Sequence, residues 1–153
     1  MVKSGTLYGV GVGPGDPELM TVKAWRLIST APVVAYLAAN GKDSTARDIA
    51  RPFIPDDAMH LVIDMPMGIE RGPGEKAYDF GAAAIAAHLK AGRDVVMLCE
   101  GDPFFYGSFM YIFARLAKHH DTIVVPGVTS ITASAAAIGR PLSARNEVVK
   151  VLP

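Results

Sequence analysis

Cysteine is almost absent from this sequence: Cys99 is the only one among 153 residues. A single cysteine cannot form a disulfide within the chain, which excludes the class of small secreted domains that disulfides stabilise. The N-terminal residues also lack the apolar stretch and the cleavage site of a signal peptide. We therefore expect a protein of the reducing cytoplasm.

An excess of charge and a long apolar run are absent too. Fifteen Lys and Arg residues balance fifteen Asp and Glu residues. A protein whose main task is to bind nucleic-acid phosphates or an anionic membrane needs a surplus of basic side chains. Pro, Gly, Asp or Lys interrupts each apolar run before it reaches the roughly 20 residues of a membrane span. We expect neither nucleic acid nor a membrane as a partner.

Several common catalytic motifs are missing as well. The four histidines, His60, His88, His119 and His120, do not stand at zinc-ligand spacing from cysteines or carboxylates. No serine lies in a GxSxG motif, so a hydrolase of that type would have no nucleophile. The sequence predicts no metal site and names no catalytic residue, which leaves the chemistry to a bound cofactor.

Short runs of Val, Ile and Leu alternate with longer helical patterns along the whole chain, whose length suits one domain. This alternation predicts an α/β fold with a mostly parallel five-stranded sheet and helices on both faces. The predicted strands lie near Thr6–Val12, Val33–Tyr36, Leu61–Asp64, Val95–Cys99 and Ile123–Val125. The predicted helices lie near Pro17–Ser29, Ser44–Arg51, Glu75–Lys90, Ser108–Lys118 and Ser130–Ile138.

Local signals support the helix ends and indicate two irregular segments. Asp16 before Pro17 is a favourable N-cap, and Gly92 is a favourable C-terminal stop. The segment Met65–Gly74 combines glycines and prolines without periodicity, so it is either a substrate-contacting loop or a solvated connector. Near the C-terminus, Glu147–Leu152 has the pattern of a further strand, which is either an edge of this sheet or the first strand of a further domain.

Three loops rich in small residues follow three of the predicted strands. The first, GVGVGPGD at Gly9–Asp16, matches neither the dinucleotide fingerprint nor the phosphate loop GxxxxGK[ST]. The second is CEGDPFFYGS at Cys99–Ser108, and the third is VVPGVTS at Val124–Ser130. Each alone is explained as well by a structural turn as by a ligand loop. Because ligands bind at the carboxyl ends of parallel strands, their joint occurrence predicts one composite crevice.

The second and third loops supply the candidate polar groups. Glu100 and Asp102 can accept hydrogen bonds from hydroxyl or ammonium groups, and Gly101 between them leaves room for a ligand. The aromatic residues that follow Pro103 are either core side chains or a wall against a flat ligand. Thr129 and Ser130 are short polar groups at a helix start, where capping alone is a sufficient reason for a hydroxyl.

In this order, the three loops are similar to the motifs of the tetrapyrrole methylases, which transfer methyl groups from S-adenosylmethionine to corrin and porphyrin precursors. The segments that carry the resemblance are GVGVGPGDPELMTVKA, CEGDPFFYGS and VVPGVTSITASAAAIGRPL. Within the family, GVGVGPGDPEL, STARDIA and CEGDPFFYGSFMYI resemble the precorrin-2 C20-methyltransferase branch of cobalamin biosynthesis. Other members of the family, and a non-catalytic cofactor-binding module, stay open as alternatives.

The resemblance implies a cofactor site and a larger protein. It implies that S-adenosyl-L-methionine is the cofactor, that precorrin-2 is the substrate, and that the protein is a homodimer. The residues that it places near the cofactor are Pro14, Glu100, Gly101, Asp102, Phe105, Tyr106, Thr129 and Ser130. It also implies that residues 1–143 are the N-terminal domain of a two-domain enzyme, with residues 144–153 as the linker and the start of a truncated second domain.

Overall fold

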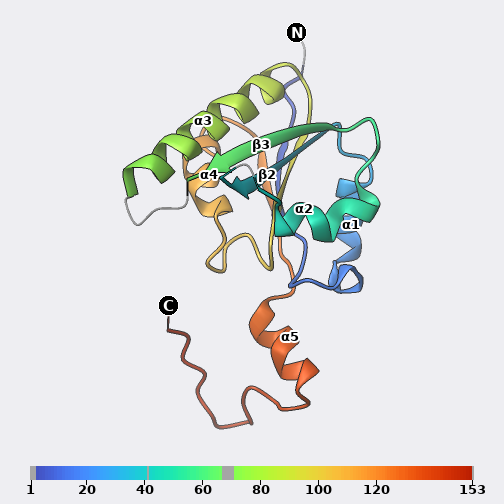
Figure 1. Ribbon diagram of the computed structural model, residues 1–153, viewed down its shortest axis with the longest axis vertical. Helices are drawn as coiled ribbons and strands as arrows, with labels where there is room; N and C mark the ends of the chain where they lie inside the picture. Colours follow the sequence, from blue (N-terminus) through green and yellow to red (C-terminus); the bar gives the residue numbers. More distant parts are fainter. Residues whose placement is uncertain (1–2, 41, 67–70, 153) are drawn as a thin grey trace.

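The structure is a computed structural model that describes residues 3–40, 42–66 and 71–152. Its strands are β1 (Leu7–Gly11), β2 (Val33–Ala39), β3 (Met59–Met65), β4 (Val95–Cys99) and β5 (Thr122–Val125). They form one sheet in the order β3-β2-β4-β1-β5 (Figure 1). Every pairing between these strands is parallel. The predicted parallel five-stranded sheet is confirmed.

Helices cover both faces of this sheet, as predicted (Figure 1). Helices α3 (Arg71–Lys90) and α4 (Phe109–Leu116) pack on one face, where Ile85, Leu89 and Phe109 are fully buried. Helices α1 (Val22–Ile28) and α2 (Thr45–Ala50) pack on the other face. All five residues of β4 are buried, because this central strand lies between the two layers.

One predicted helix is interrupted, and another continues into a 3-10 turn, each for a local reason. The stretch Pro17–Ser29 divides into a 3-10 turn, Pro17–Leu19, and α1, because Met20 and Thr21 are extended. The hydroxyl of Thr21 then caps α1 by accepting a hydrogen bond from the amide of Ala24 at 3.1 Å. Helix α2 passes into a 3-10 turn, Arg51–Phe53, since Pro52 has no N–H to continue the α-helical hydrogen bonds.

The predicted end signals are confirmed. The carboxylate of Asp16 accepts a hydrogen bond from the amide of Glu18 at 2.9 Å, which caps the 3-10 turn. Gly92 has φ +78, the left-handed conformation that ends a helix after its last turn.

The prediction of a loop over Met65–Gly74 is wrong at its end, because α3 begins at Arg71. A first helical turn tolerates proline and glycine, since its amides have no acceptor within the helix. Residues 67–70 of the predicted loop lie outside the described residues.

The residues Glu147–Leu152 do not add an edge strand to this sheet. They form no strand and are exposed, and the chain here lies apart from the sheet (Figure 1), so their place in a second domain stays a prediction. A segment with a strand-like sequence becomes a strand only when a neighbour accepts its backbone hydrogen bonds. The preceding helix, α5 (Ser130–Ala137), also extends from the body of the domain, and none of its residues is buried.

Candidate active site at the carboxyl ends of three strands

Backbone hydrogen bonds hold the three small-residue loops together. The loops after β1 and β4 form an antiparallel bridge, in which the amide of Gly101 donates to the carbonyl of Gly13 at 2.8 Å. The loops after β4 and β5 are joined by Asp102, whose Oδ2 accepts a hydrogen bond from the amide of Gly127 at 3.0 Å. The predicted composite crevice is therefore one connected unit at the carboxyl edge of the sheet.

Glycine is required where these loops cross. A Cβ atom on Gly127 would overlap the carbonyl oxygen of Gly101, and one on Gly11 would lie 2.5 Å from the same oxygen. The three glycines come from three different loops, so their spacing in the sequence does not reveal that they meet. Close backbone packing is thus a structural reason for part of the glycine pattern.

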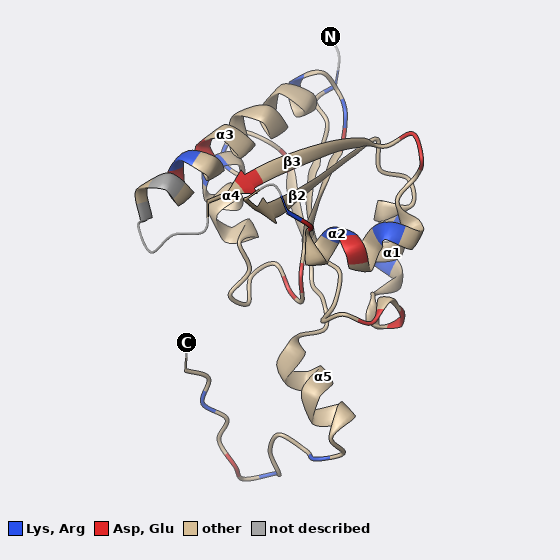
Figure 2. Ribbon diagram, viewed as in Figure 1, with Lys and Arg blue, Asp and Glu red and all other residues tan. Residues whose placement is uncertain are grey.

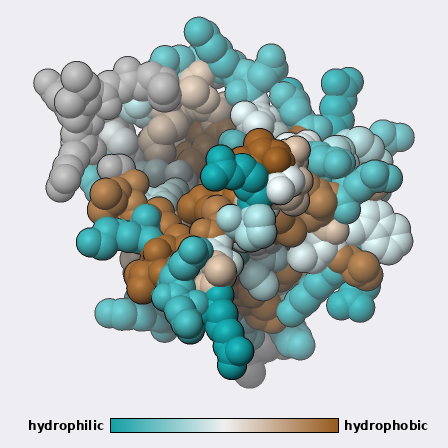
Figure 3. Space-filling model, turned by 90° about the horizontal axis from the view of Figure 1, so that it is seen from below, coloured by the Kyte–Doolittle hydropathy of each residue, from teal (hydrophilic) through white to brown (hydrophobic). Residues whose placement is uncertain are grey.

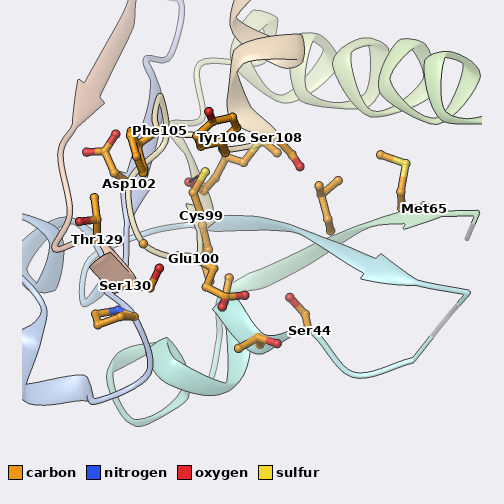
Figure 4. Close-up of a pocket in the computed structure, with 18 of the residues that line it drawn as sticks. Ser44, Met65, Cys99, Glu100, Asp102, Phe105, Tyr106, Ser108, Thr129 and Ser130 are labelled. Carbon is orange, nitrogen blue, oxygen red and sulfur yellow. Dashed lines mark hydrogen bonds between the residues drawn. The ribbon is translucent and has the colours of Figure 1, made fainter. Parts of the chain in front are cut away.

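A cavity of about 460 Å³ lies beside the crossing loops, within the size range of small-molecule sites (Figure 4). All eight residues that the sequence placed near a ligand line this cavity. They are Pro14, Glu100, Gly101, Asp102, Phe105, Tyr106, Thr129 and Ser130. The structure brings together every predicted site residue, although their contact with a cofactor stays a prediction.

The opposite side of the cavity consists of residues outside the three predicted loops. This side is formed by the end of β2, the start of α2 and the end of β3, and it includes Leu37, Ser44 and Met65 (Figure 4). The side chain of Ser44 is buried and caps α2 by accepting from the amide of Arg47. The rule that ligands bind at strand carboxyl ends also applies to β2, so this signal was available in the sequence.

The loop after β4 has an unusual backbone. Gly101 has φ +62 and Tyr106 has φ +53, both in the left-handed region. A Cβ on Gly101 would have its nearest neighbour at 3.9 Å, so the conformation and not crowding by the protein explains the glycine. Tyr106 has no such freedom, and its ring is 62% exposed beside Phe105 at a centroid distance of 5.1 Å.

The two carboxylates of this loop have different environments. Asp102 is fixed, because its Oδ1 accepts a hydrogen bond from the amide of Phe104 at 2.9 Å and its Oδ2 from that of Gly127. Glu100 is exposed, and its carboxylate forms no hydrogen bond or ion pair with any other described residue. Cys99, just before them, is buried, and desolvation raises the pKa of its thiol to about 12.

The third loop starts α5 as predicted, with Thr129 as its N-cap residue. The hydroxyl of Thr129 does not cap a backbone amide, however. It lies 3.2 Å from the hydroxyl of Thr132, and the side chain lines the cavity. Capping of a backbone amide therefore does not explain the hydroxyl of Thr129.

Neither a metal site nor a membrane span is found in the described residues. No group of three or more His, Cys, Asp or Glu side chains there has the geometry to hold a metal ion. No described helix is long and apolar enough to cross a membrane. His60 contacts the hydroxyl of Tyr36 at 3.2 Å, and His88 accepts a hydrogen bond from Arg93 at 3.1 Å.

Several curated proteins similar to this chain are named for cobalamin biosynthesis or for precorrin methylation. The chain is 48% identical to the cobalamin biosynthesis protein CobIJ of Mycobacterium tuberculosis, over all of this chain and 32% of that protein. It is 41% identical to a precorrin-2 C(20)-methyltransferase of Sinorhizobium, over 97% of this chain and 64% of that enzyme. The chain thus spans about a third and about two thirds of the lengths of these two relatives.

Solved structures with a similar fold are methyltransferases as well. The uroporphyrin III C-methyltransferase of Thermus thermophilus superposes with a TM-score of 0.68 and 36% identity, over 93% of this chain and 55% of that chain. A structure of the Thermus enzyme with S-adenosyl homocysteine has a TM-score of 0.65 and 33% identity, over 93% and 51% of the two chains.

The family assignment rests on nearly the whole chain. Residues 6–153 match the family model of the tetrapyrrole (corrin/porphyrin) methylases. This range contains the sheet, the three joined loops and every residue that lines the cavity. The chain belongs to the tetrapyrrole methylase family.

Proposed function

We propose that this protein transfers a methyl group from S-adenosyl-L-methionine to C20 of precorrin-2, a step that gives precorrin-3A. The observation that carries the proposal is the cavity where three loops meet at the carboxyl ends of β1, β4 and β5. Its relatives named for C20 methylation support the substrate, at 41% identity for the Sinorhizobium enzyme. The Thermus uroporphyrin enzyme, at 36% identity, keeps another tetrapyrrole as the alternative substrate.

The residues around the cavity fit this cofactor. The open space above Gly101 lets a ligand approach the backbone of the Glu100–Asp102 turn. The hydroxyl groups of Thr129 and Ser130 can bond to the methionine or ribose portions, and Pro14 and Phe105 provide apolar walls. Asp102 fixes the loop that carries these groups, because it ties this loop to the one after β5.

When bound, the cofactor supplies a methyl group on a sulfonium, and the thioether that remains is a leaving group that needs no acid catalysis. The task of the protein is then to orient the two reactants, with the methyl carbon and the acceptor carbon about 3–3.5 Å apart and in line. Leu37, Ala39 and Met65 form the apolar side of the cavity, opposite the loop after β4. These side chains exclude water and hold the flat face of the acceptor.

Calorimetry and a product assay test the proposal. S-adenosylhomocysteine should bind the protein encoded by its complete gene, and Ser130→Tyr, which fills the cavity, should abolish binding. The matched change Thr30→Tyr is at an exposed residue just after α1, outside the cavity lining, and should leave binding unchanged. Precorrin-2 should gain one methyl group at C20, located by NMR. Methylation at another carbon, or of uroporphyrinogen in its place, would reject the substrate that we propose.

We also propose that the protein is a cytoplasmic homodimer. Support for association comes from α5, which carries no charged residue and buries none of its side chains (Figure 2). Five of its eight residues are Ile or Ala, and an exposed helix of this composition is typically covered by protein. Viewed from the α5 end, several groups of hydrophobic atoms lie on the surface (Figure 3). Light scattering should give a molar mass of two chains for the wild type. The variant Ala135→Glu, which places a charge on α5, should have the molar mass of a single chain.

A further inference from the structure

The two carboxylates that follow β4 have become chemically different through their neighbours. Both oxygens of Asp102 accept hydrogen bonds from backbone amides, those of Phe104 and Gly127. Each of these bonds joins the carboxylate to the backbone of a loop, so both oxygens of Asp102 already hold the site together. Asp102 therefore has a structural task, which is to join the loop after β4 to the loop after β5.

Glu100 has the opposite properties. Its side chain lines the cavity and is exposed, and its carboxylate has no hydrogen-bond or ion-pair partner in the described parts of the chain. In Figure 4, Asp102 lies beside Phe105 and Thr129, whereas Glu100 lies between Ser130 and Ser44. The carboxylate of Glu100 thus faces the space where a ligand would be, with its proton-accepting capacity unused.

The other titratable groups that face the cavity do not compete for this role. Asp43, at the start of α2, forms an ion pair with Arg47 at 3.2 Å. Burial keeps the thiol of Cys99 neutral, with its pKa raised to about 12. Tyr106 brings a phenol hydroxyl, which is a donor when protonated. Glu100 is the free carboxylate among these described residues.

We propose that Glu100 is the proton acceptor of the methyl transfer, an inference that rests on the proposed function. The sulfonium C–S bond breaks, its electron pair stays on sulfur, and the methyl group forms a C–C bond with C20 of the macrocycle. The macrocycle gains a positive charge and must lose one proton to return to its original charge. The carboxylate of Glu100 takes this proton and passes it to water, so the products are S-adenosylhomocysteine, the methylated macrocycle and one H⁺.

The test compares two matched substitutions in the protein encoded by its complete gene. Glu100→Gln keeps the size of the side chain but cannot accept a proton, and we expect kcat to fall by about 100-fold or more. The Kd for S-adenosylhomocysteine should change by less than twofold and the urea midpoint by less than about 0.2 M, because Gln keeps the size of the side chain and a hydrogen-bond acceptor at this exposed position. The kcat of the wild type should fall at acid pH, and this fall should be absent in Glu100→Gln. Glu18→Gln, at an exposed glutamate outside the cavity, should leave all four quantities unchanged.

Three results would overturn the inference, and they are distinguishable. If the wild type turns over and Glu100→Gln keeps kcat within threefold, Glu100 is not the acceptor and the proposed function stands. If Glu100→Gln weakens S-adenosylhomocysteine binding as much as it lowers kcat/KM, the carboxylate binds the cofactor instead. If the wild type binds S-adenosylhomocysteine but does not methylate any tetrapyrrole, both the proposed function and the inference fail.

Discussion

The carboxylate of Asp102 accepts a hydrogen bond from the backbone amide of Gly127 at 3.0 Å, which joins the loop after β4 to the loop after β5. The amide of Gly101, one residue earlier, donates to the carbonyl of Gly13 in the loop after β1. Two adjacent residues of one loop therefore hold both neighbouring loops in place. The shape of the cavity therefore depends on this short segment.

Replacing Asp102 by Ala should affect both stability and binding. The free energy of unfolding should fall by about 1.5–3 kcal/mol, because two backbone amides lose a charged acceptor. S-adenosylhomocysteine should bind more weakly by a similar amount, since the loops that line the cavity are no longer joined. Urea unfolding and calorimetry measure the two effects, and Asp57→Ala, at an exposed turn, is the control. Unchanged affinity with an intact fold would mean that Asp102 stabilises the turn without shaping the cofactor site.

The close packing of the glycine loops predicts that a glycine-to-alanine change has opposite effects on stability at Gly127 and at Gly74. Gly127→Ala should lower the free energy of unfolding by about 2–3 kcal/mol, because its methyl group would overlap the backbone of Gly101. Gly74→Ala should raise it by about 0.5–1 kcal/mol, since Gly74 is in α3, has open space around it, and alanine is a better helix former. Equal thermal stability of the two variants would contradict the close packing of the loops.

At Gly101, the left-handed backbone should limit the stability of variants, and the size of the new side chain should limit their binding of the cofactor. Its φ of +62 strains any L-residue, so Gly101→Ala should cost about 1 kcal/mol of stability, and Gly101→Asn should cost less because Asn tolerates this region. Gly101→Val should weaken S-adenosylhomocysteine binding more than Gly101→Ala does, if the open space above Gly101 receives the cofactor. Melting curves and titrations of the three variants separate the two requirements. Parallel losses of stability and binding would assign the glycine to the backbone alone.

The sequence predicts the sheet and the composite crevice because both depend on local signals. Apolar runs identify the five strands, and small residues after β1, β4 and β5 identify the loops. The start of α3 could not be predicted because proline and glycine occur both in loops and in a first helical turn. Whether Glu147–Leu152 forms a strand depends on a strand beside it, which no local pattern contains. The same limit applies to the site: Pro14 and Asp102 are predictable as cavity residues, but the contact of Asp102 with Gly127 is a consequence of the folded arrangement.

Cys99 predicts how stability changes at alkaline pH. Burial raises the pKa of its thiol from 9.0 to about 12, so the unfolded chain loses this proton before the folded chain does. The contribution of Cys99 to stability is complete below about pH 9 and is lost as the pH rises toward 12, with a slope of at most about 1.4 kcal/mol per pH unit. Tyr78, whose pKa burial also raises, contributes in both proteins and cancels in a comparison with Cys99→Ala. The difference in free energy of unfolding between wild type and Cys99→Ala, measured by urea unfolding, should therefore become smaller as the pH rises from 9 to 12. A difference that stays constant over this range would show that the thiol is accessible to water.

Tyr106 should show that a strained residue serves binding at the expense of stability. Its φ of +53 costs about 1–3 kcal/mol for a non-glycine residue, and its ring is 62% exposed at the cavity, so burial does not compensate. Tyr106→Gly removes the strain and the contact with Phe105, and we expect the free energy of unfolding to stay within about 0.5 kcal/mol of the wild type or to rise. Affinity for the tetrapyrrole should fall by at least about tenfold, because an exposed aromatic ring beside Phe105 provides a surface for a flat ligand. The control is Tyr111→Gly, which removes the same side chain from inside α4, where it stacks on Tyr78 at 4.7 Å, and which should lower stability by more than about 1 kcal/mol. If Tyr106→Gly destabilises the protein as much as Tyr111→Gly does, the left-handed backbone is supported by the fold itself and gives no evidence for a ligand contact.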